Sequence, residues 1–300
     1  MTDGPPRTTI SAWRPTVPGI AEVFHAHFTE HAYPSHTHDT WALMILNDGA
    51  VDFACDRHRH GAAGSGTVVL LPPGVAHDGR TVTAAGFRKR VLYLDATVLP
   101  EELTGRAVDG PVFGDELLRH RIHQLHTSLG RRDELLRHRI HQLHTSLGRR
   151  DEGHTAAVHT GEAFEAESRL SFIRERLLFH LAALQPPRTP GREANRLAAA
   201  LRDLLDSRLP TGISLQEAAA VLHAHPTHLI RCFKQTYGLP PHTYLTGKRI
   251  ERARGLLLDG RRPAEVAATV GFHDQAHLHR HFTRHVGTTP SRYAATRRRP

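Results

Sequence analysis

The stretch GFHDQAHLHRHFTRHVGTTP, residues 271–290, holds five histidines, and its pattern determines how the carboxyl-terminal part of the chain folds. Four of them lie four residues apart, a spacing that places side chains on one face of a helix: His273, His277, His281 and His285. Two histidines so placed can hold a metal, as in zinc proteases. A zinc site needs three or four converging ligands, however, and no carboxylate or cysteine completes a set here. We therefore interpret the histidines as surface or packing groups of a helix, with a metal site as the less favoured alternative.

Two short helices with a turn between them are predicted around these histidines. Residues 263–270 form the first, with Val266 and Val270 inward, and Gly271 can adopt the left-handed conformation that the turn needs. The second helix buries Leu278, Phe282 and Val286. Its opposite face carries Gln275, Ala276, His277, Arg280 and Arg284.

The same arrangement occurs once more upstream. Apolar residues recur at helical spacing at Leu215, Ala218, Ala219 and Leu222, and Pro226 suits the first position of the next helix. That next helix would bury Leu229, Cys232 and Phe233 and point Thr227, Arg231 and Lys234 outward. A short helix, a tight turn and a helix with an outward basic row form a helix-turn-helix unit.

Charge is distributed unevenly along the 300 residues. Residues 211–300 hold 14 Lys and Arg against 5 Asp and Glu, whereas residues 1–210 hold 25 of each kind. The whole excess of +9 therefore lies in the last 90 residues, which indicates a polyanionic partner for that segment.

Residues 196–295 resemble the AraC/XylS family of bacterial transcription regulators. The resemblance is carried by ISLQEAAAVLHAHPTHLIRCFKQTYGLPPHTYLTGKRIERARGLLLDG and by the ending VGFHDQAHLHRHFTRHVGTTPSRY. It implies two helix-turn-helix units joined by a long helix at about Pro241–Leu258, with both recognition helices entering the major groove. One departure is His223, where the family commonly has glycine; histidine tolerates the left-handed region less well, so strain is expected there.

The resemblance also implies residue roles at the DNA. Base contacts map onto Thr227, Ile230 and Arg231 in the first unit and onto Gln275, Ala276, His277 and Arg280 in the second. Arginine can pair with guanine and glutamine with adenine, whereas Ile230 and Ala276 could only touch thymine methyl groups. Lys234, Lys248 and Arg284 are interpreted as phosphate contacts, which position the protein without specifying sequence.

The amino-terminal part has the pattern of short antiparallel strands. Residues 20–95 alternate apolar runs with Gly, Pro and Asp turns, and Asn47-Asp48-Gly49 is a hairpin signal. Phe24, Ala26 and Phe28 would face one side and His25 and His27 the other. We expect a small closed β-barrel that can hold one small ligand.

The spacings in this part resemble the cupin superfamily. The resemblance rests on His36-Thr37-His38 followed by Gly49, and on GTVVLLPPGVAH, residues 66–77, which ends at His77. It implies a possible divalent-metal site at His36, His38 and His77, with Ala42 where cupin enzymes have glutamate. The preferred alternative is an organic effector pocket without metal, formed by those histidines and lined also by Trp41, Arg88 and Tyr93; a plain structural barrel is the third alternative.

The middle of the chain contains an internal repeat. DELLRHRIHQLHTSLGRR occurs in tandem at 115–132 and 133–150. Eighteen residues make five helical turns, so the duplication would preserve an apolar stripe: Leu118, Ile122, Leu125 and Leu129, then Leu136, Ile140, Leu143 and Leu147. Gly130 and Gly148 are expected to break each helix. A second amphipathic helix is expected at 162–184, with Phe172, Leu177 and Leu181.

We therefore predict an α+β protein: a cupin-like β-barrel at 1–113, a helical linker or dimerisation region at 114–192, and an all-α tandem helix-turn-helix domain at 193–300. The predicted function is a cytoplasmic, sequence-specific transcription regulator, by family habit an activator, controlled by a small-molecule effector. Double-stranded DNA, RNA polymerase and a second copy are the expected partners, with no membrane and no required cofactor. Two alternatives are a metal-dependent cupin enzyme with an accessory basic domain and a nonspecific nucleoid protein.

Overall fold

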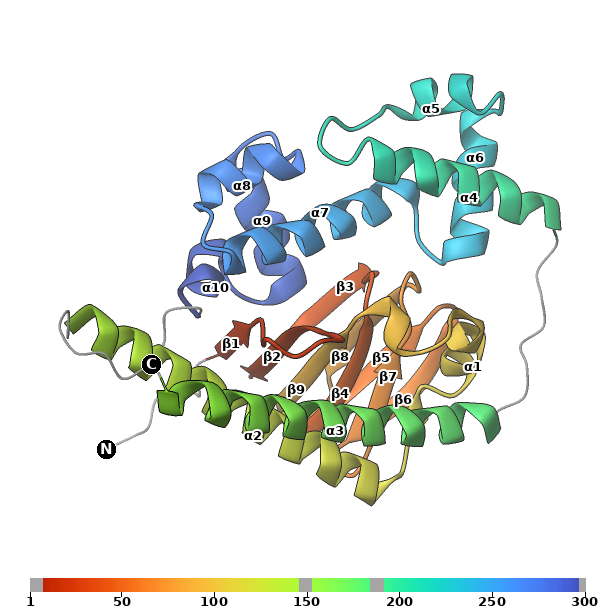
Figure 1. The fold of residues 1–300 in the computed structure, drawn as a ribbon. Helices are drawn as coiled ribbons and strands as arrows, with labels where there is room; N and C mark the ends of the chain where they lie inside the picture. The colour runs from red at the N-terminus through yellow and green to blue at the C-terminus, as the bar shows by residue number, and fades with distance from the viewer. Residues whose placement is uncertain (1–7, 146–152, 184–191, 297–300) are drawn as a thin grey trace.

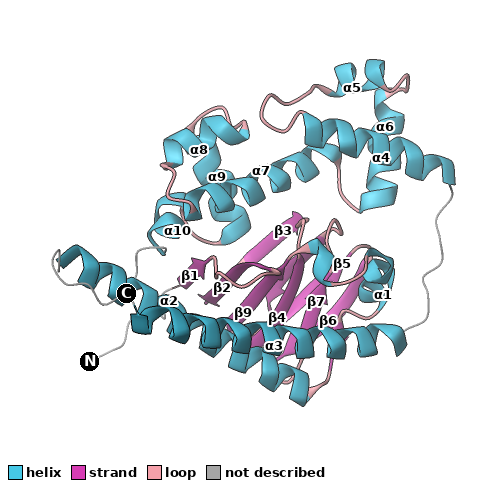
Figure 2. Cartoon of the chain, viewed as in Figure 1, coloured by secondary structure: helices cyan, strands magenta, loops and turns pink. Residues whose placement is uncertain are grey.

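The computed structural model describes residues 8–145, 153–183 and 192–296. Figure 1 shows three layers: a carboxyl-terminal group of helices, a central pair of β-sheets, and two long helices, α2 and α3, on the far side of the sheets. Figure 2 shows that the strands are confined to the middle layer. Among the described helices, none is both long and apolar enough to span a bilayer.

Ten strands form two separate sheets rather than one closed barrel. The strands are β1 (Thr9–Trp13), β2 (Ile20–Phe28), β3 (Ala32–His36), β4 (Trp41–Asp48), β5 (Ala50–Cys55), β6 (His58–Gly64), β7 (Val68–Leu71), β8 (His77–Thr81), β9 (Phe87–Leu94) and β10 (Val112–Phe113). The larger sheet has the order β1-β2-β9-β4-β7-β10 and the smaller β3-β8-β5-β6. The expected closed barrel is thus wrong in detail, because no strand pairing among the described residues joins the two sheets, and we call this unit the β-sandwich.

The alternation predicted for the strands is present. Phe24, Ala26 and Phe28 of β2 are buried, while His25 and His27 are half-buried on the other face. In β4 both faces are buried: Ala42 and Met44 contact the core between the sheets, whereas Leu43 and Ile45 contact the core beneath α2 and α3. This explains why 41–46 is an unbroken apolar run.

The repeat lies on the outer face of the larger sheet. Helix α2 (Glu116–Thr145) includes the first copy and continues into the second, and α3 (Gly153–Ala183) packs against it. The stripe of the first copy is buried as predicted, with Leu118, Ile122 and Leu125 fully inaccessible. The helix runs through Gly130, so the predicted break there is wrong, while Leu147 and Gly148 lie outside the described residues.

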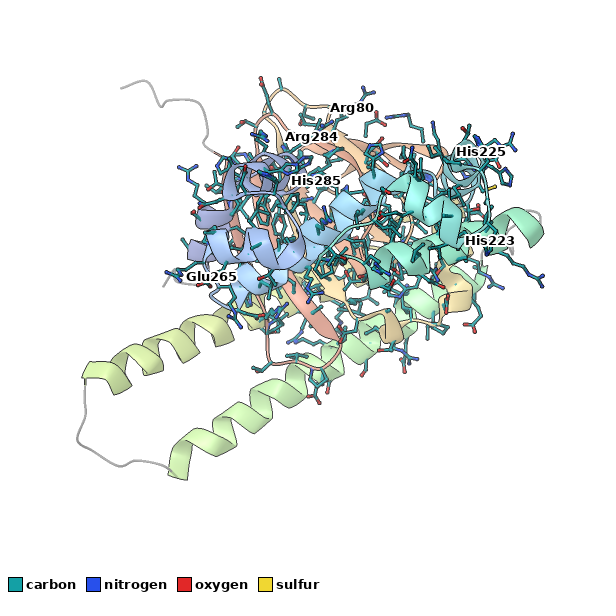
Figure 3. The ribbon with its side chains drawn as sticks, turned by 90° about the horizontal axis from the view of Figure 1, so that it is seen from above. Arg80, His223, His225, Glu265, Arg284 and His285 are labelled. Carbon is teal, nitrogen blue, oxygen red and sulfur yellow. The ribbon has the colours of Figure 1, made fainter. Side chains whose placement is uncertain are left out.

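Both helices therefore form a second apolar core with the outer face of the larger sheet and do not lie between the sandwich and the carboxyl-terminal unit. Figure 3, seen from above, shows them extending well beyond the rest of the molecule. A short helix, α1 (Thr104–Asp109), precedes them. Of α3, which begins earlier than predicted, Leu177 and Leu181 are buried and Phe172 is half-buried under the Arg121 guanidinium.

The described residues of the carboxyl-terminal unit, 192–296, form seven helices: α4 (Arg192–Ser207), α5 (Leu215–Val221), α6 (Pro226–Tyr237), α7 (Pro241–Leu258), α8 (Pro263–Val270), α9 (Gln275–Val286) and α10 (Pro290–Thr296). Ser214 and Glu217 form a capping box at the start of α5, and Pro226 and Pro263 begin α6 and α8. Both predicted helix-turn-helix units and the long connecting helix are confirmed. Gly271 is in the left-handed conformation, with φ of 86°.

The second helix-turn-helix unit packs directly on the sandwich. Helix α9 contacts β3, and α10 contacts β1. A Cβ at Gly287 would come within 2.4 Å of the Phe28 ring, which shows how closely the two units approach. One apolar core, including Phe24 and Tyr93 of the sandwich and Leu257 and Phe282 of the helices, continues across the boundary.

Candidate DNA-binding face and effector cavity

The outward row of α6 is accessible to solvent. Thr227, Arg231 and Lys234 are exposed, and Ile230, an apolar side chain, is 38% exposed. The opposite face, Leu229, Cys232 and Phe233, is buried in the core of the first unit. Helix α6 therefore presents to solvent all four side chains predicted for its DNA-facing surface.

Helix α9 has the same division. Gln275, Ala276, Arg280 and Arg284 are exposed, and His277 is half-buried against Phe272. Asp274 caps the helix by accepting from the His277 backbone N–H, at 2.6 Å, which orients the first turn. The predicted DNA-facing side chains of α9 therefore share one accessible surface.

The two recognition helices are held apart by α7 (Figure 1). Its 18 residues make a helix about 27 Å long. Successive major-groove segments on one face of B-DNA repeat about every 34 Å. Figure 3 shows the labelled Arg284 and His285 of α9 well apart from His223 and His225, which lie in the turn before α6. The connecting helix is therefore comparable in length to that repeat, although somewhat shorter.

Lys248 differs from the other predicted contacts. It lies on α7, and its ammonium forms an ion pair with Asp39 of the β-sandwich, where only 12% of the side chain is exposed. Nearby, the Asp39 backbone N–H donates to Glu251 at 2.7 Å. In this conformation Lys248 holds the two units together and does not present its charge to a phosphate group.

A cavity lies where the two units meet. Its volume is about 60 Å³, and its walls come from both sheets and from three residues of the carboxyl-terminal unit, Arg254, His285 and Val286. Apolar side chains form much of the wall, among them Phe24, Met44, Val51, Phe53, Leu71, Phe87 and Val91. The cavity is thus closed on one side by the end of recognition helix α9.

The three histidines of the cupin-like pattern meet in this cavity. His36 ends β3, His77 begins β8, and one ring nitrogen from each of His36, His38 and His77 lies within 4.8 Å of the others. Burial lowers the pKa of His77 to about 4 and holds those of His36 and His38 well below the usual range. All three rings are therefore neutral at pH 7 and chemically suited to bind a transition metal or to hydrogen-bond a ligand.

Lys89 is the cation of the cavity. Burial, followed by the charge of Arg254, lowers its pKa to about 7. Its ammonium lies 4.0 Å from the centre of the Tyr33 ring, and no acidic side chain among the described residues forms an ion pair with it. A buried ammonium without a counter-ion is unfavourable, so the site favours an anionic ligand.

Two of the predicted effector contacts lie elsewhere. Trp41 is fully buried beneath α2 and α3, where its Nε1 donates to the Ala96 carbonyl at 3.3 Å. Arg88 points to solvent and pairs with Asp48. The expectation that these two line the cavity is wrong, because alternation along a strand does not show which face is the interior. His36, His38, His77 and Tyr93 do line it.

Sequence reasoning missed the contribution of the carboxyl-terminal unit to this cavity. Arg254 is almost completely buried; its Nη2 donates to Glu22 at 2.5 Å, its Nε donates to the Tyr293 hydroxyl at 3.2 Å, and it lies over the Tyr93 ring. An arginine inside a basic helical segment resembles a surface residue. The only signal was its position one turn from buried Ile250 and Leu257.

A β-sandwich with an internal cavity, joined to two helix-turn-helix units with exposed basic rows, defines a regulator that combines ligand binding and DNA binding. A family model described as an AraC-like ligand binding domain matches residues 19–171, and one described as a helix-turn-helix domain matches residues 218–296. The chain therefore belongs to the AraC family of transcriptional regulators.

Known transcriptional regulators are similar to this chain over most of its length. The MmsAB operon regulatory protein of Pseudomonas aeruginosa is 28% identical over 279 residues, covering 88% of this chain and 78% of that protein. YbfI of Bacillus subtilis, an uncharacterized HTH-type transcriptional regulator, is 24% identical over 254 residues, covering 82% and 81%. The crystal structure of ToxT from Vibrio cholerae O395 is similar in fold, with a TM-score of 0.50, 11% identity, and coverage of 96% of this chain and 97% of that one.

Proposed function

We propose that a small acidic molecule binds in the cavity between the β-sandwich and the carboxyl-terminal unit and thereby controls how α6 and α9 meet a promoter. The observation that carries the proposal is the composition of the cavity wall. His285 and Val286, the last two residues of α9, line the cavity, while Gln275 and Arg280 of the same helix face solvent. A ligand that touches one end of this helix can move the other.

The size of the cavity supports coupling. A volume of about 60 Å³ has room for only a few water molecules, whereas small-molecule pockets usually measure about 300–1,000 Å³. An organic effector must therefore displace part of the cavity wall. Arg254, His285 and Val286 are the wall residues that belong to the carboxyl-terminal unit, which can move as a body relative to the sandwich. Ligand binding then changes the position of the second helix-turn-helix unit.

Lys89 supports the chemical class of the effector. An acid group placed beside this ammonium would supply the counter-ion that it lacks and restore its charge at pH 7. The surrounding phenylalanine and aliphatic side chains suit an apolar body. We therefore propose a small carboxylic acid with an apolar tail.

At the promoter, the proposed base contacts are Thr227, Ile230, Arg231, Gln275, Ala276, His277 and Arg280, with Lys234 and Arg284 at phosphates. Lys248 would reach a phosphate only if its ion pair with Asp39 opened. Activation through RNA polymerase, in the cytoplasm, completes the proposal and rests on the family resemblance.

A homodimer is proposed through α2 and α3. Leu117 and Phe179 are 45% and 65% exposed, and the contacts of Asp115 with Arg176 and His180 place them at the same end of the helix pair. Exposed apolar side chains that lie together favour an interface. Light scattering of the wild type and of Phe179→Ser would test this, with a change from dimer to monomer expected.

The competing enzyme function is less favoured. Ala42 occupies the position of the cupin glutamate, and Asp78, the carboxylate in the described cavity wall, accepts from the Ala54 backbone N–H at 2.9 Å. No unengaged carboxylate is thus present in the described part of that wall to act as a fourth metal ligand or as a carboxylate general base. We propose that the protein acts on DNA and is not an enzyme.

The deciding experiment combines genome-wide footprinting with two variants. Arg280→Ala should cost about 1–3 kcal/mol at one base position of the operator, whereas Lys234→Ala should weaken binding to all sequences alike. Arg57→Ala, an exposed arginine of the sandwich, serves as the matched control and should change neither. Equal losses on every sequence for Arg280→Ala and Lys234→Ala would refute the assigned roles.

A separate measurement tests the effector. Thermal shift against a panel of small carboxylic acids should find ligands that stabilise the wild type but not Lys89→Met, whose side chain keeps a similar length without charge. Operator binding by Lys89→Met should persist and lose its response to the acid. A variant that responds like the wild type would contradict an anion site at Lys89.

A further inference from the structure

Four histidines from two different units face the same cavity. Three belong to the β-sandwich and one, His285, belongs to recognition helix α9. We propose that His36, His38 and His77 bind one divalent transition-metal ion and that His285 completes its ligand set, so that the metal ties the second helix-turn-helix unit to the sandwich. This site shares the cavity with the proposed acid contact at Lys89, but its ligands are other residues, and its test uses no acid.

The first observation is the geometry of the three sandwich histidines. Their ligand atoms lie within 4.8 Å of one another. Around a tetrahedral zinc ion with Zn–N bonds near 2.0–2.1 Å, nitrogen atoms are about 3.3 Å apart. Each ring must therefore move inward by less than about 1 Å, which side-chain torsions can accommodate.

The second observation is how the rings are held. The Nδ1 atoms of His36 and His77 lie 2.7 Å and 3.0 Å from the carbonyl oxygens of Pro34 and Val75. A carbonyl oxygen can only accept a hydrogen bond, so Nδ1 of each ring carries a proton and donates it, and Nε2 is the nitrogen left to bind a metal. A histidine that ligates a metal through one nitrogen usually donates from the other to a carbonyl or carboxylate group.

His285 is held in the same way. Its Nδ1 lies 2.8 Å from the His281 carbonyl, and its Nε2 is buried without a hydrogen-bond partner among the described residues. The residue is 8% exposed, and its ring centre is 6.1 Å from that of His36. His285 lies outside the group of three whose ligand atoms are within 4.8 Å of one another, so its ring must move closer to take the fourth coordination position. Its unpartnered buried nitrogen, next to His36, is the group suited to that position.

The ligand type, rather than the surrounding charge, selects the metal. Lys89, Arg254 and Asp78 also line the cavity, and Arg254 is paired with Glu22. With four neutral nitrogen ligands and a nearby ammonium, the site disfavours magnesium and calcium, which prefer oxygen ligands. Zinc, cobalt, nickel and copper prefer imidazole, and zinc takes four ligands most readily.

The consequence is that the metal concentration would affect DNA binding. A ligand bond from His285 would fix the carboxyl end of α9 on the sandwich and limit the movement that the second unit can make. Loss of metal would release that end while leaving the fold of each unit intact. The metal would thus act on the position of a recognition helix rather than on a reaction.

The experiment uses the full chain without a histidine tag, depleted of metal by chelation and titrated with zinc under competition. We expect one tight site per chain that His36→Ala abolishes, and a loss of about 10- to 100-fold in affinity for His285→Ala. His279→Ala, an exposed histidine of the same helix, is the matched control and should bind like the wild type. Circular dichroism of the metal-free variants shows whether each one still folds.

Absorption spectroscopy of the cobalt-substituted protein provides a second, independent measurement. The wild type should show the intense visible absorption of four-coordinate cobalt, and His285→Ala should show a weaker, altered band. Hydrogen exchange in residues 281–287 should slow on zinc binding in the wild type but not in His285→Ala. Absence of a tight site that His36→Ala removes, or identical zinc affinity and cobalt spectra for His285→Ala and His279→Ala, would overturn the proposal. Operator binding by metal-free protein is measured in parallel and tests the proposed function separately.

Discussion

His223 lies in the turn of the first helix-turn-helix unit with φ of 48°, in the left-handed region that favours glycine. The strain expected from the sequence is therefore present. Gly271 occupies the equivalent turn of the second unit, with φ of 86°. The two units have the same backbone requirement and meet it with different residues.

Replacing His223 with glycine should stabilise the first unit. Glycine removes a left-handed strain of about 1–2 kcal/mol but adds freedom to the unfolded chain, so a net gain of up to about 1 kcal/mol is expected. Chemical denaturation of wild type and variant measures it. A loss of stability would show that the exposed imidazole contributes more than the backbone strain costs.

Gly271→Ala should have the opposite effect. A Cβ there would lie 2.3 Å from the Pro210 carbonyl oxygen, on a backbone that disfavours L residues. We expect destabilisation of about 2–4 kcal/mol and weaker operator binding, because the turn that orients α9 is distorted. Gly66→Ala, where the added methyl meets nothing within 4 Å and no left-handed φ is recorded, is the control. Equal stability of the two variants would contradict this account.

At the scale of elements, Asp115 joins the two helices that cover the larger sheet. It accepts from the Leu118 backbone N–H at 2.9 Å, from Arg176 at 2.6 Å and from His180 at 2.7 Å. Burial acts to raise the pKa of Asp115, but these three donors outweigh burial, and the pKa lies well below its usual range. The carboxylate therefore caps α2 and fixes α3 upon it.

The pH dependence of the stability of Asp115→Asn tests whether the Asp115 carboxylate connects α2 to α3. A carboxyl group with a depressed folded pKa contributes stability above its unfolded pKa, near 3.9, and loses that contribution as pH falls below it. The variant should be about 1–3 kcal/mol less stable at pH 7 and should lose less stability than the wild type below about pH 4. Thermal unfolding between pH 3 and 7 measures both; parallel curves for the two proteins would contradict the assignment.

At the scale of the whole molecule, a buried polar group connects the sandwich to the carboxyl-terminal unit. Glu22 accepts from Arg254 at 2.5 Å and from the Tyr293 hydroxyl at 2.5 Å. Thr296 adds a hydrogen bond from its hydroxyl to the Ala12 carbonyl at 3.1 Å. These contacts hold the second helix-turn-helix unit against the cavity.

Glu22→Gln should loosen this docking. Removing one partner of a buried ion pair leaves an uncompensated charge, which costs about 3–5 kcal/mol. Hydrogen exchange in α10 and β1 should therefore accelerate, with β4 unchanged as an internal reference. In Glu22→Gln/Arg254→Met the uncompensated charge is absent, so protection of α10 and β1 from hydrogen exchange should recover in part. If hydrogen exchange in Glu22→Gln is no faster than in the wild type, Glu22 does not hold the two units together.

Residue patterns predicted every helix of the two helix-turn-helix units. Apolar periodicity, a proline at the first turn of α6, α7 and α8, and a glycine directly after α6, α8 and α9 are local signals that specify these helices. In the sandwich the strands were predictable for the same reason, but the pairing of strands was not. Two open sheets replace the expected closed barrel because edge pairing depends on contacts between residues far apart in sequence.

For the candidate site, too, some features followed from the sequence and others only from the tertiary structure. The amino-acid sequence by itself determined that the basic rows of α6 and α9 face away from their buried stripes, and its resemblance to the cupin pattern implied that His36, His38 and His77 share one site. Only the tertiary structure decided that Trp41 and Arg88 lie outside the cavity, that Lys248 pairs with Asp39, and that Arg254 and His285 close the cavity. The physical reason is that helix and strand periods specify which face a side chain takes, whereas the packing of one unit on another specifies what that face meets.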